Sequence, residues 1–395
     1  MTKFGLAVVT NKLNYGSLLQ TFALVHVLDK MKIDCEVIDQ SGLKKSISAN
    51  RRRYYLRHLV DISLYKAKAG FAFMKLREKY DTAFGRKIGE RRAAFSSFVA
   101  RQLHFSKRFH DFGELNDHCK NYSAVMVGSD QLWLPVNLYG DFYTLSFVPD
   151  GVKRLSYATS FGVASITAAE EKIAASFLTR FQHISVREDS GRKLIMRLTG
   201  SEAAVVCDPV FLLSAQEWND IFEKYTCPIQ EPYIFCYFLG RHQFSREFAM
   251  TLQKKTGLRI VTLRHLDEYI AKDEAFGDIA PYDIGPFEFV RLIQQAAYMV
   301  TDSFHGTAFS ILLHKDFYAF HRHMDNDPHS TNTRIDMLLS AVGLQNRLVE
   351  RNAPSQQIHT VWSEINYQEV DERVAKLRRS SMDYLRQIVE ECTDD

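Results

Sequence analysis

The segment TDSFHGTAFS (301–310) contains residue types that can bind an anion and move a proton. It follows an apolar run typical of a buried strand, and a helix is predicted to begin there with Asp302 or Ser303 as its N-cap. Backbone amides at a helix start form an anion site, and Gly306 leaves room for a ligand to approach the backbone. His305 beside them can donate a proton or bind an anionic group. The alternative is a capped helix with a structural histidine.

Arg187 lies at the end of another apolar strand, in SVRED (185–189). Ligands of open α/β sheets bind outside the carboxyl ends of the strands, so this position suits a binding residue. The guanidinium of Arg187 could hold a carboxylate or a phosphate through two parallel hydrogen bonds. Alternatively, Arg187 forms only an ion pair with the neighbouring Glu188 or Asp189.

The segment VGSDQLW (127–133) combines a strand end with a polar turn. Ser129, Asp130 and Gln131 offer hydrogen-bonding groups there, and Trp133 could present an aromatic face on which a sugar stacks. The alternative is an ordinary turn that is followed by a tryptophan in the hydrophobic core.

Asn14, Tyr15 and Gly16 lie in NYGSLLQ (14–20), between the first predicted strand and the first predicted helix. This is the position of a ligand-binding loop, but it lacks the GxGxxG pattern of a dinucleotide site. A simple helix-entry loop is an equally good interpretation of these residues.

A polar loop, HRHMDNDPHSTNTR (321–334), follows a further predicted strand. Its histidines (His321, His323 and His329) match no standard metal spacing, so we expect no metal site. A loop with an anion-binding arginine, Arg334, is the favoured interpretation. GxSxG, HExxH and Walker A motifs are absent from the sequence, which argues against the commonest hydrolases, metalloproteases and P-loop proteins.

The elements around these loops alternate between strands and helices, which predicts an α/β fold with parallel sheets. The length of 395 residues suggests two domains, and 46% hydrophobic and 25% charged residues are ordinary globular values. We therefore expect two Rossmann-like domains facing a cleft. The predicted parts are a first domain (1–213) with a basic helical insertion (about 44–110), a second domain (214–350) and a C-terminal helical tail packing back on the body (351–395).

The net charge of +3 conceals an uneven distribution. Residues 44–108 carry 18 basic and four acidic side chains, a net charge of +14, whereas the rest carries 32 basic and 43 acidic ones. This basic segment could be a solvated helical excursion whose aromatic face packs on the first domain, or it could contact an anionic membrane. No nucleic-acid motif accompanies the charge, so we expect no nucleic-acid partner.

The predicted location is the cytoplasm. Six cysteines are scattered without a CxxC pair, as in proteins of a reducing compartment. No apolar run reaches the roughly 18 residues that span a bilayer, and MTKFGLAVVT lacks the features of a signal peptide. Peripheral contact with the inner face of the cell membrane is compatible with this location.

Taken together, these segments resemble the polysaccharide pyruvyl transferase family. The similar segments occur in the family's order over residues 4–345: NYGSLLQTFAL, VGSDQLW, SYATSFG (156–162), SVRED, CDPVFLL (207–213) and VTDSFHGTAFSILLHKDF (300–317). The resemblance implies two Rossmann-like domains of the GT-B type. It also implies transfer of a pyruvyl group from phosphoenolpyruvate to a sugar, usually as a cyclic ketal, with no further cofactor.

Residue by residue, the resemblance makes His305 the general acid or a phosphate partner and Arg187 a ligand of phosphoenolpyruvate. Some relatives have an arginine and a leucine directly before this histidine, where this chain has Ser303 and Phe304. Arg334 is our candidate for the missing anion-binding arginine.

The implied acceptor is a hexose of a lipid-linked oligosaccharide, a precursor of a cell-surface polysaccharide. Asp130 could act as the base toward a sugar hydroxyl, and Gln131 and Trp133 could bind the sugar. Two alternatives stay open at this point: a GT-B glycosyltransferase that uses a nucleotide sugar, and a non-catalytic sugar-binding protein.

Overall fold

The structure is a computed structural model of the chain. It describes residues 2–58, 62–163, 165–265, 270–324, 327, 330–350 and 364–393, and only the backbone of 62–69. His329 and residues 351–363 of the predicted tail lie outside the described residues.

The first domain is built on a parallel sheet of four strands in the order β2-β1-β3-β4. Its strands are β1 (Lys3–Ala7), β2 (Asp34–Val37), β3 (Ala124–Val127) and β4 (Lys153–Ser156). The central strands β1 and β3 are the apolar and almost fully buried ones, as parallel sheets require, whereas the edge strand β2 is partly exposed. Leu6 pairs with Val37 on one side and with Met126 on the other. A short parallel pair, β5 (Ser185–Val186) and β6 (Ala204–Val205), continues from β4 through isolated bridges.

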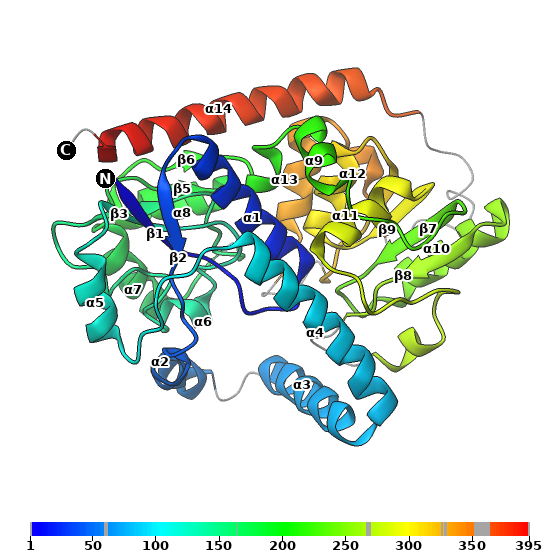
Figure 1. Ribbon diagram of the computed structural model, residues 1–395, viewed down its shortest axis with the longest axis horizontal. Coiled ribbons are helices and arrows are strands. Elements are labelled where there is room, and N and C mark those ends of the chain that lie inside the picture. Colours follow the sequence, from blue (N-terminus) through cyan, green and yellow to red (C-terminus); the bar gives the residue numbers. More distant parts are fainter. Residues whose placement is uncertain are drawn as a thin grey trace.

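The second domain repeats this architecture with a parallel sheet in the order β10-β9-β7-β8. Its strands are β7 (Tyr233–Tyr237), β8 (Arg259–Thr262), β9 (Tyr298–Thr301) and β10 (Asp316–Ala319). The two sheets lie side by side with helices between and around them (Figure 1). The predicted fold class, two Rossmann-like domains, is therefore confirmed.

Helices connect the strands and cover both sheets. Those in the first part of the chain are α1 (Tyr15–Lys30), α5 (Phe112–Cys119), α6 (Pro135–Leu138), α7 (Ala168–Leu178), α8 (Asp189–Thr199), the 3-10 turn η1 (Pro209–Phe211) and α9 (Ala215–Phe222). Those in the second part are α10 (Gln243–Thr256), η2 (Ala271–Glu274), α11 (Pro286–Gln295), α12 (Phe304–Leu312), α13 (Thr333–Val342) and η3 (Gln345–Arg347). None of the described helices is long and apolar enough to cross a bilayer.

The basic segment is helical, as predicted, and forms α2 (Lys44–Arg57), α3 (Ile62–Tyr80) and α4 (Thr82–Gln102). Its packing differs from the expectation, because the aromatic face of α4 contacts both domains and not the first alone. The ring of Phe98 lies 6.0 Å from Phe22 of α1 and 4.9 Å from Phe287 of α11. Figure 1 shows α4 crossing the front of the molecule between the two domains.

A long C-terminal helix, α14 (Tyr367–Thr393), closes the molecule by contacting both domains (Figure 1). Near its start, the Tyr367 hydroxyl donates to the Lys315 carbonyl of the second domain at 2.6 Å. Further along, Arg378 donates to the carbonyl of Phe211 at 2.8 Å, and Ser381 accepts from the Cys207 amide at 2.9 Å. The predicted closing helix is thus present, and it holds both domains together.

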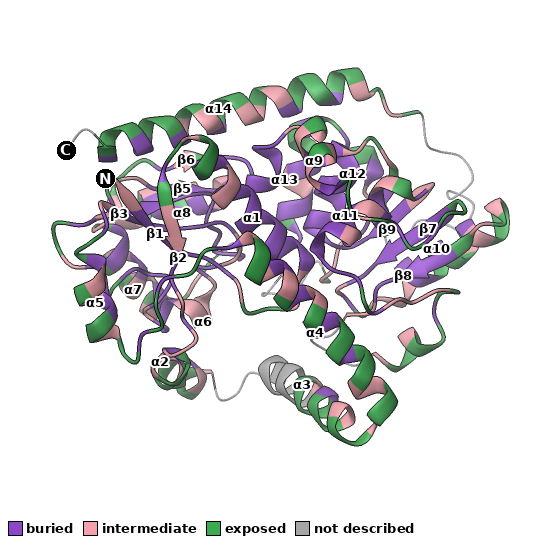
Figure 2. Cartoon of the chain, viewed as in Figure 1, coloured by how far each residue is buried: buried purple, intermediate pink, exposed green. Residues whose placement is uncertain are grey.

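One hydrophobic core runs through the contact between the domains. It joins β1 and α1 of the first domain to α11 and α12 of the second, and Figure 2 shows these elements mostly buried. Arg91 of α4 reinforces this contact although it is only 1% exposed. Its guanidinium donates to the carbonyls of Tyr282 at 2.6 Å and Pro281 at 3.0 Å, in the loop before α11.

Replacing Arg91 by alanine should lower the free energy of unfolding by about 2–4 kcal/mol, because two buried carbonyl groups lose a charged donor. Urea unfolding followed by circular dichroism measures the difference. Arg86→Ala, an exposed arginine of the same helix, is the matched control. Equal losses in the two variants would contradict the structural role of Arg91.

Candidate functional site

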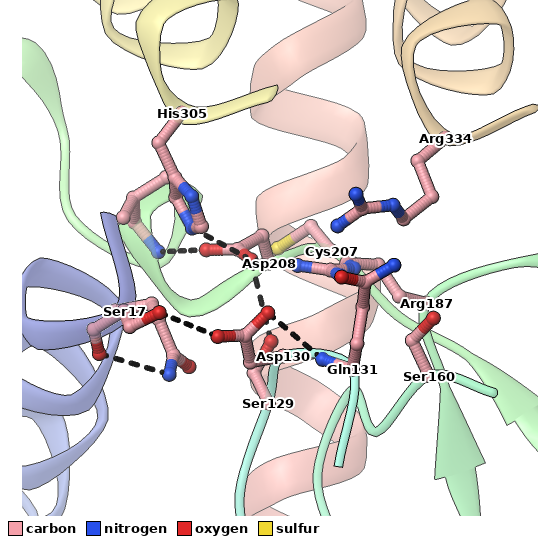
Figure 3. A network of polar contacts seen from close by, with 12 residues as sticks. Ser17, Ser129, Asp130, Gln131, Ser160, Arg187, Cys207, Asp208, His305 and Arg334 are labelled. Carbon is pink, nitrogen blue, oxygen red and sulfur yellow. Dashed lines mark hydrogen bonds and ion pairs between the residues drawn. The ribbon is translucent and has the colours of Figure 1, made fainter. Parts of the chain in front are cut away.

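Half of the predicted site residues, six of twelve, meet in one cavity between the two domains. The cavity has a volume of about 190 Å³ and lies at the carboxyl ends of strands from both sheets. The predicted residues that line it are Asn14, Asp130, Gln131, Ser303, His305 and Arg334. In Figure 3, His305 and Arg334 reach in from the top of the view, and Asp130 and Gln131 reach in from below.

A buried carboxylate, Asp208, holds the two central residues in place. Its Oδ2 accepts from Nη1 of Arg187 at 2.6 Å and lies 3.4 Å from Nε2 of His305 (Figure 3). Arg187 therefore pairs across strands with Asp208 and not with Glu188 or Asp189 beside it. Sequence reasoning missed Asp208, although it directly follows the apolar run AAVVC and so satisfies the same strand-end rule as Arg187.

The negative charge of Asp208 is strongly stabilised by its surroundings. Burial alone would raise the pKa of Asp208, but the charges of His305 and Arg187 outweigh it and hold that pKa well below its ordinary value. The backbone amide of Val210 adds a hydrogen bond of 3.1 Å to the other carboxylate oxygen. Asp208 is therefore ionised at neutral pH and fixes the position of both partners.

Arg187 keeps two donors for a ligand. Its Nε and Nη2 atoms are buried and have no hydrogen-bond partner, and the guanidinium lines a second cavity of about 110 Å³ together with Arg334. The Phe304 ring lies beside both guanidinium groups, 4.7 Å from that of Arg187 and 5.9 Å from that of Arg334. Burial and the nearby charges of Arg187 and Arg322 lower the pKa of Arg334 to about 9. An anion between these arginines would accept hydrogen bonds from the unpartnered Arg187 donors and would stabilise the charged form of Arg334.

Further polar atoms at the site make no hydrogen bond. Within the described residues, they include Nε2 of Gln131 and Nε of Arg322. Nε2 of His305 also makes no hydrogen bond, although it lies 3.4 Å from the Asp208 carboxylate. Glu188 contributes an unpartnered acceptor, Oε2, near Arg187. Buried polar groups are normally paired, so this concentration of donors indicates a ligand rich in acceptor oxygens.

Asp130 has an unusual backbone and a charged side chain. Its φ of 85° lies in a region that few residues other than glycine adopt, and it places the carboxylate at the cavity. Its Oδ2 accepts from the Ser17 hydroxyl at 2.6 Å. Burial would raise the pKa of Asp130, but Lys12 and Arg187 outweigh this and lower it. Asp130 is therefore available as a hydrogen-bond acceptor or a base.

Gly16 and Asn14 shape the site through α1. A Cβ at Gly16 would lie 2.0 Å from Nδ1 of His305, so only glycine lets the first turn of α1 pack against this ring. Asn14 caps the helix, with its Oδ1 accepting from the Ser17 amide at 3.1 Å. Asn14 also lines the cavity, whereas Gly16 acts by fitting His305 and not by providing a ligand group.

The ligand-binding roles predicted for Trp133 and Tyr15 are wrong, because both side chains lie in the hydrophobic core. Trp133 is fully buried, and its Nε1 donates to the Tyr143 carbonyl at 3.0 Å. Tyr15 is 1% exposed, stacks on Phe289 at 4.6 Å, and donates to the Ile284 carbonyl at 3.0 Å. Tyr15 thus fastens α1 to the second domain, and Trp133 supports the first.

Two further predictions are corrected in their role. Ser129 is fully buried and its hydroxyl donates to Asp208 at 3.3 Å, so it supports that carboxylate behind the cavity. A Cβ at Gly306 would lie 2.7 Å from the Thr301 hydroxyl, so this glycine lets α12 pack closely on β9. The ligand approach that we expected at Gly306 is therefore occupied by the strand.

Ser303, one of the two residues predicted as the cap, is the N-cap of α12. Ser303 accepts from the Gly306 amide at 3.3 Å and lines the cavity. Asp302 instead accepts from the amides of Leu239 at 2.6 Å and Gly240 at 2.9 Å, which anchors the loop after β7.

Sequence reasoning missed two basic residues of the cavity, Lys12 and Arg322. Both follow strands, β1 and β10, so the strand-end rule could have found them.

Two histidines of the 321–334 loop lie close to carboxylates. His321 lies 2.6 Å from Asp336, and His323 lies 3.2 Å from Asp327. The described residues hold no group of three or more histidine, cysteine or acidic side chains placed to bind a metal ion.

The family of the chain follows from its sequence. A family model described as polysaccharide pyruvyl transferase matches residues 14–323. The chain belongs to this family. The matched region begins at the cap of α1 and includes Asp130, Arg187, Asp208 and His305, so the central residues of the cavity lie within the shared part.

A solved structure shares the fold of the chain at low sequence identity. The UDP-N-acetylglucosamine 2-epimerase of Rickettsia bellii matches with a TM-score of 0.51 and 12% identity, over 100% of this chain and 97% of that one. The heptosyltransferase WaaC of E. coli, solved with ADP, has a TM-score of 0.39 and 14% identity, over 95% of this chain and 100% of that one. No curated protein matches the chain in sequence. This member of the polysaccharide pyruvyl transferase family has two Rossmann-like domains of the GT-B type.

Asp208→Asn should lower the free energy of unfolding at pH 7 by about 3–5 kcal/mol, because Arg187 is left buried without its counter-charge. A depressed carboxyl pKa contributes stability above the ordinary pKa and loses it as pH falls through the folded value. The wild type should therefore lose stability faster than the variant below about pH 4.

Urea unfolding over a series of pH values tests this, with the exposed Asp220→Asn as the control. Parallel pH curves for the wild type and Asp208→Asn would show that folding leaves the pKa of Asp208 unchanged and would contradict its charge pairing with Arg187 and His305.

Proposed function

We propose that this protein transfers the pyruvyl group of phosphoenolpyruvate to a hexose of a polysaccharide precursor and closes the product as a cyclic ketal. The observation that carries the proposal is the pair of unpartnered donors on buried Arg187, which lines one cavity with Arg334 and shares the Asp208 carboxylate with His305. Phosphoenolpyruvate has a carboxylate and a phosphate, and so carries the acceptor oxygens and negative charge that these groups need.

The donor would bind between the two domains. Arg187 offers Nε and Nη2 to one anionic group in the geometry of a bidentate pair. Arg334 and Arg322 offer charge to the other anionic group from the second domain. Some relatives have an arginine and a leucine directly before the histidine, where this chain has Ser303 and Phe304. Arg334 and Arg322 would take the place of that arginine.

His305 would act as the general acid. In the proposed reaction it protonates the C3 methylene carbon, which becomes the methyl group and leaves a cationic centre at C2. The Asp208 carboxylate, 3.4 Å from Nε2 of His305, stabilises the protonated imidazole that the step requires. The packing of Gly16 against the ring holds the imidazole in place.

Asp130 would act as the base toward the sugar. It takes the proton of the hydroxyl that attacks C2; phosphate then leaves and a second hydroxyl closes the ketal. The two sugar hydroxyls lose two protons in total. One of them restores the proton that His305 gave to C3, and the other leaves with the phosphate. Asp130 suits this role because its lowered pKa keeps it ionised at neutral pH. Asn14 and Gln131 line the same cavity and would bind sugar hydroxyls.

The reaction, as proposed, needs no cofactor because the donor supplies its own leaving group. We place it in the cytoplasm, where phosphoenolpyruvate is available, in the synthesis of a capsule or exopolysaccharide. The acceptor that best fits such a pathway is a lipid-linked oligosaccharide.

Phosphoenolpyruvate should raise the melting temperature of the protein, whereas nucleotide sugars should not. Arg334→Gln should weaken phosphoenolpyruvate binding by about 10- to 100-fold, the effect of losing one charged hydrogen-bond donor. Arg379→Gln, on the exposed surface of α14, should bind as the wild type does. Differential scanning fluorimetry with titrated ligand gives both values.

The opposite ligand response would overturn the proposal. Stabilisation by a nucleotide sugar, and none by phosphoenolpyruvate, would identify a glycosyltransferase. Binding of sugars alone would identify a non-catalytic sugar-binding protein. Mass spectrometry of lipid-linked sugars incubated with phosphoenolpyruvate then shows whether an acceptor gains the pyruvyl ketal as phosphate is released.

His305→Asn should lower turnover by about 10²- to 10⁴-fold while phosphoenolpyruvate still raises the melting temperature. The reason is that the variant keeps the anion site of Arg187 and Arg334 but loses the proton donor. His314→Asn, an exposed histidine at the end of α12, should retain full activity. Near-normal turnover in His305→Asn would exclude the general-acid role.

A further inference from the structure

The outer end of helix α3 exposes large apolar side chains. Nine such side chains are exposed in the described part of the chain, and four of them lie between residues 71 and 80. They are Phe71 and Phe73 (each 50% exposed), Leu76 (55%) and Tyr80 (70%). A patch of this kind on an otherwise ordinary surface marks an interaction site.

The spacing of these residues gives α3 an outward apolar face. Phe73, Leu76 and Tyr80 follow one another at intervals of three and four residues, so they share one face of the helix. Met74, on a different face, is only 7% exposed and lines the inner side of the hairpin that α3 forms with α4. The outward face therefore contributes little to the core, and Figure 2 shows the described end of α3 largely exposed at the edge of the molecule.

One basic side chain flanks this apolar face. Lys79 is exposed beside Tyr80, whereas Lys75 lines the inner cavity with Met74 and lies 3.7 Å from Glu78. Both lysines belong to the 44–108 segment with its net charge of +14. The hairpin itself (residues 62–102) has ten basic and three acidic residues, a net charge of +7, whereas the chain outside 44–108 has an excess of acidic residues. Exposed aromatic and aliphatic residues with lysines beside them are typical of a helix that lies in a membrane interface.

The hairpin also lies next to the candidate active site. A cavity of about 330 Å³ separates α3 and α4 from the loop after β1, and it is lined by Phe71, Phe84 and Lys12 among others. Lys12 lines the catalytic cavity as well. The basic, apolar hairpin is therefore at the mouth of the cleft and not on a remote face.

We propose that the α3–α4 hairpin docks the protein on an anionic lipid bilayer. Phe73, Leu76 and Tyr80 enter the boundary between headgroups and acyl chains, and Lys79 contacts lipid phosphates. Charge favours this occupant over a second copy of the chain, since a symmetric contact would bring two strongly basic hairpins together. Docking in this position would present the cleft to an acceptor held in the membrane; that consequence, unlike the docking, rests on the proposed function.

Flotation of the full chain with lipid vesicles tests the docking. Binding is expected to vesicles of phosphatidylcholine with phosphatidylglycerol at low salt, and should be lost at high salt or on pure phosphatidylcholine. The combined variant Phe73→Ser, Leu76→Ser and Tyr80→Ser should bind on the order of 10- to 100-fold more weakly. The matched control is Val205→Ser with Met250→Ser, which alters exposed apolar residues elsewhere.

A charge variant isolates the second half of the interaction. Lys79→Glu should weaken binding by about 10-fold, whereas Lys376→Glu, also at an exposed lysine, should change it little. If the wild type fails to bind anionic vesicles at low salt, or if the α3 variants bind as well as the wild type, the proposal is wrong.

Two further measurements separate the remaining outcomes. Analytical ultracentrifugation would overturn the proposal in favour of a second copy if the wild type were a dimer that the α3 variants dissociate. Phosphoenolpyruvate should raise the melting temperature of the α3 variants as much as that of the wild type, because Phe73, Leu76 and Tyr80 lie outside the donor site. A failure of the proposed function would thus appear in that assay, and a failure of docking only in flotation.

Discussion

The buried carboxylate of Asp208 is the interaction on which the candidate site depends. It comes from the first domain, pairs with Arg187 of the same domain at 2.6 Å, and lies 3.4 Å from His305 of the second. One negative charge therefore fixes the positions of Arg187 and His305 at the same time, across the contact between the domains. Because Asp208 satisfies only one Arg187 nitrogen, Nε and Nη2 of Arg187 have no hydrogen-bond partner.

The position of His305 also depends on how closely the two domains approach. The first turn of α1 can touch the imidazole only because residue 16 is glycine, and Tyr15 beside it is fixed by Phe289 and the Ile284 carbonyl. Helices outside the two sheets maintain this approach, since Arg91 of α4 binds the loop before α11 and α14 contacts both domains. The inner side of the basic insertion therefore helps to hold the two domains together, and its outer side stays exposed.

Local sequence patterns were sufficient to predict the fold class and several members of the site. Parallel strands are buried on both faces and appear as apolar runs, and polar residues just after them lie at one edge of a sheet. This rule found Asp130, Arg187 and His305, and it would have found Asp208 and Lys12 had it been applied at every strand. It failed at Trp133 and Tyr15, because residue type does not show whether an aromatic ring faces a cavity or the core.

The sequence by itself determined the alternation of strands and helices, the basic helical insertion and the family, because each depends on residues close together in the chain or on an ordered set of motifs. Only the tertiary structure decided which side chains act together. The contact of Asp208 with His305 joins residues almost a hundred positions apart, and Gly16 meets His305 from the other end of the chain. Such contacts are set by the packing of two domains, and no local pattern encodes them.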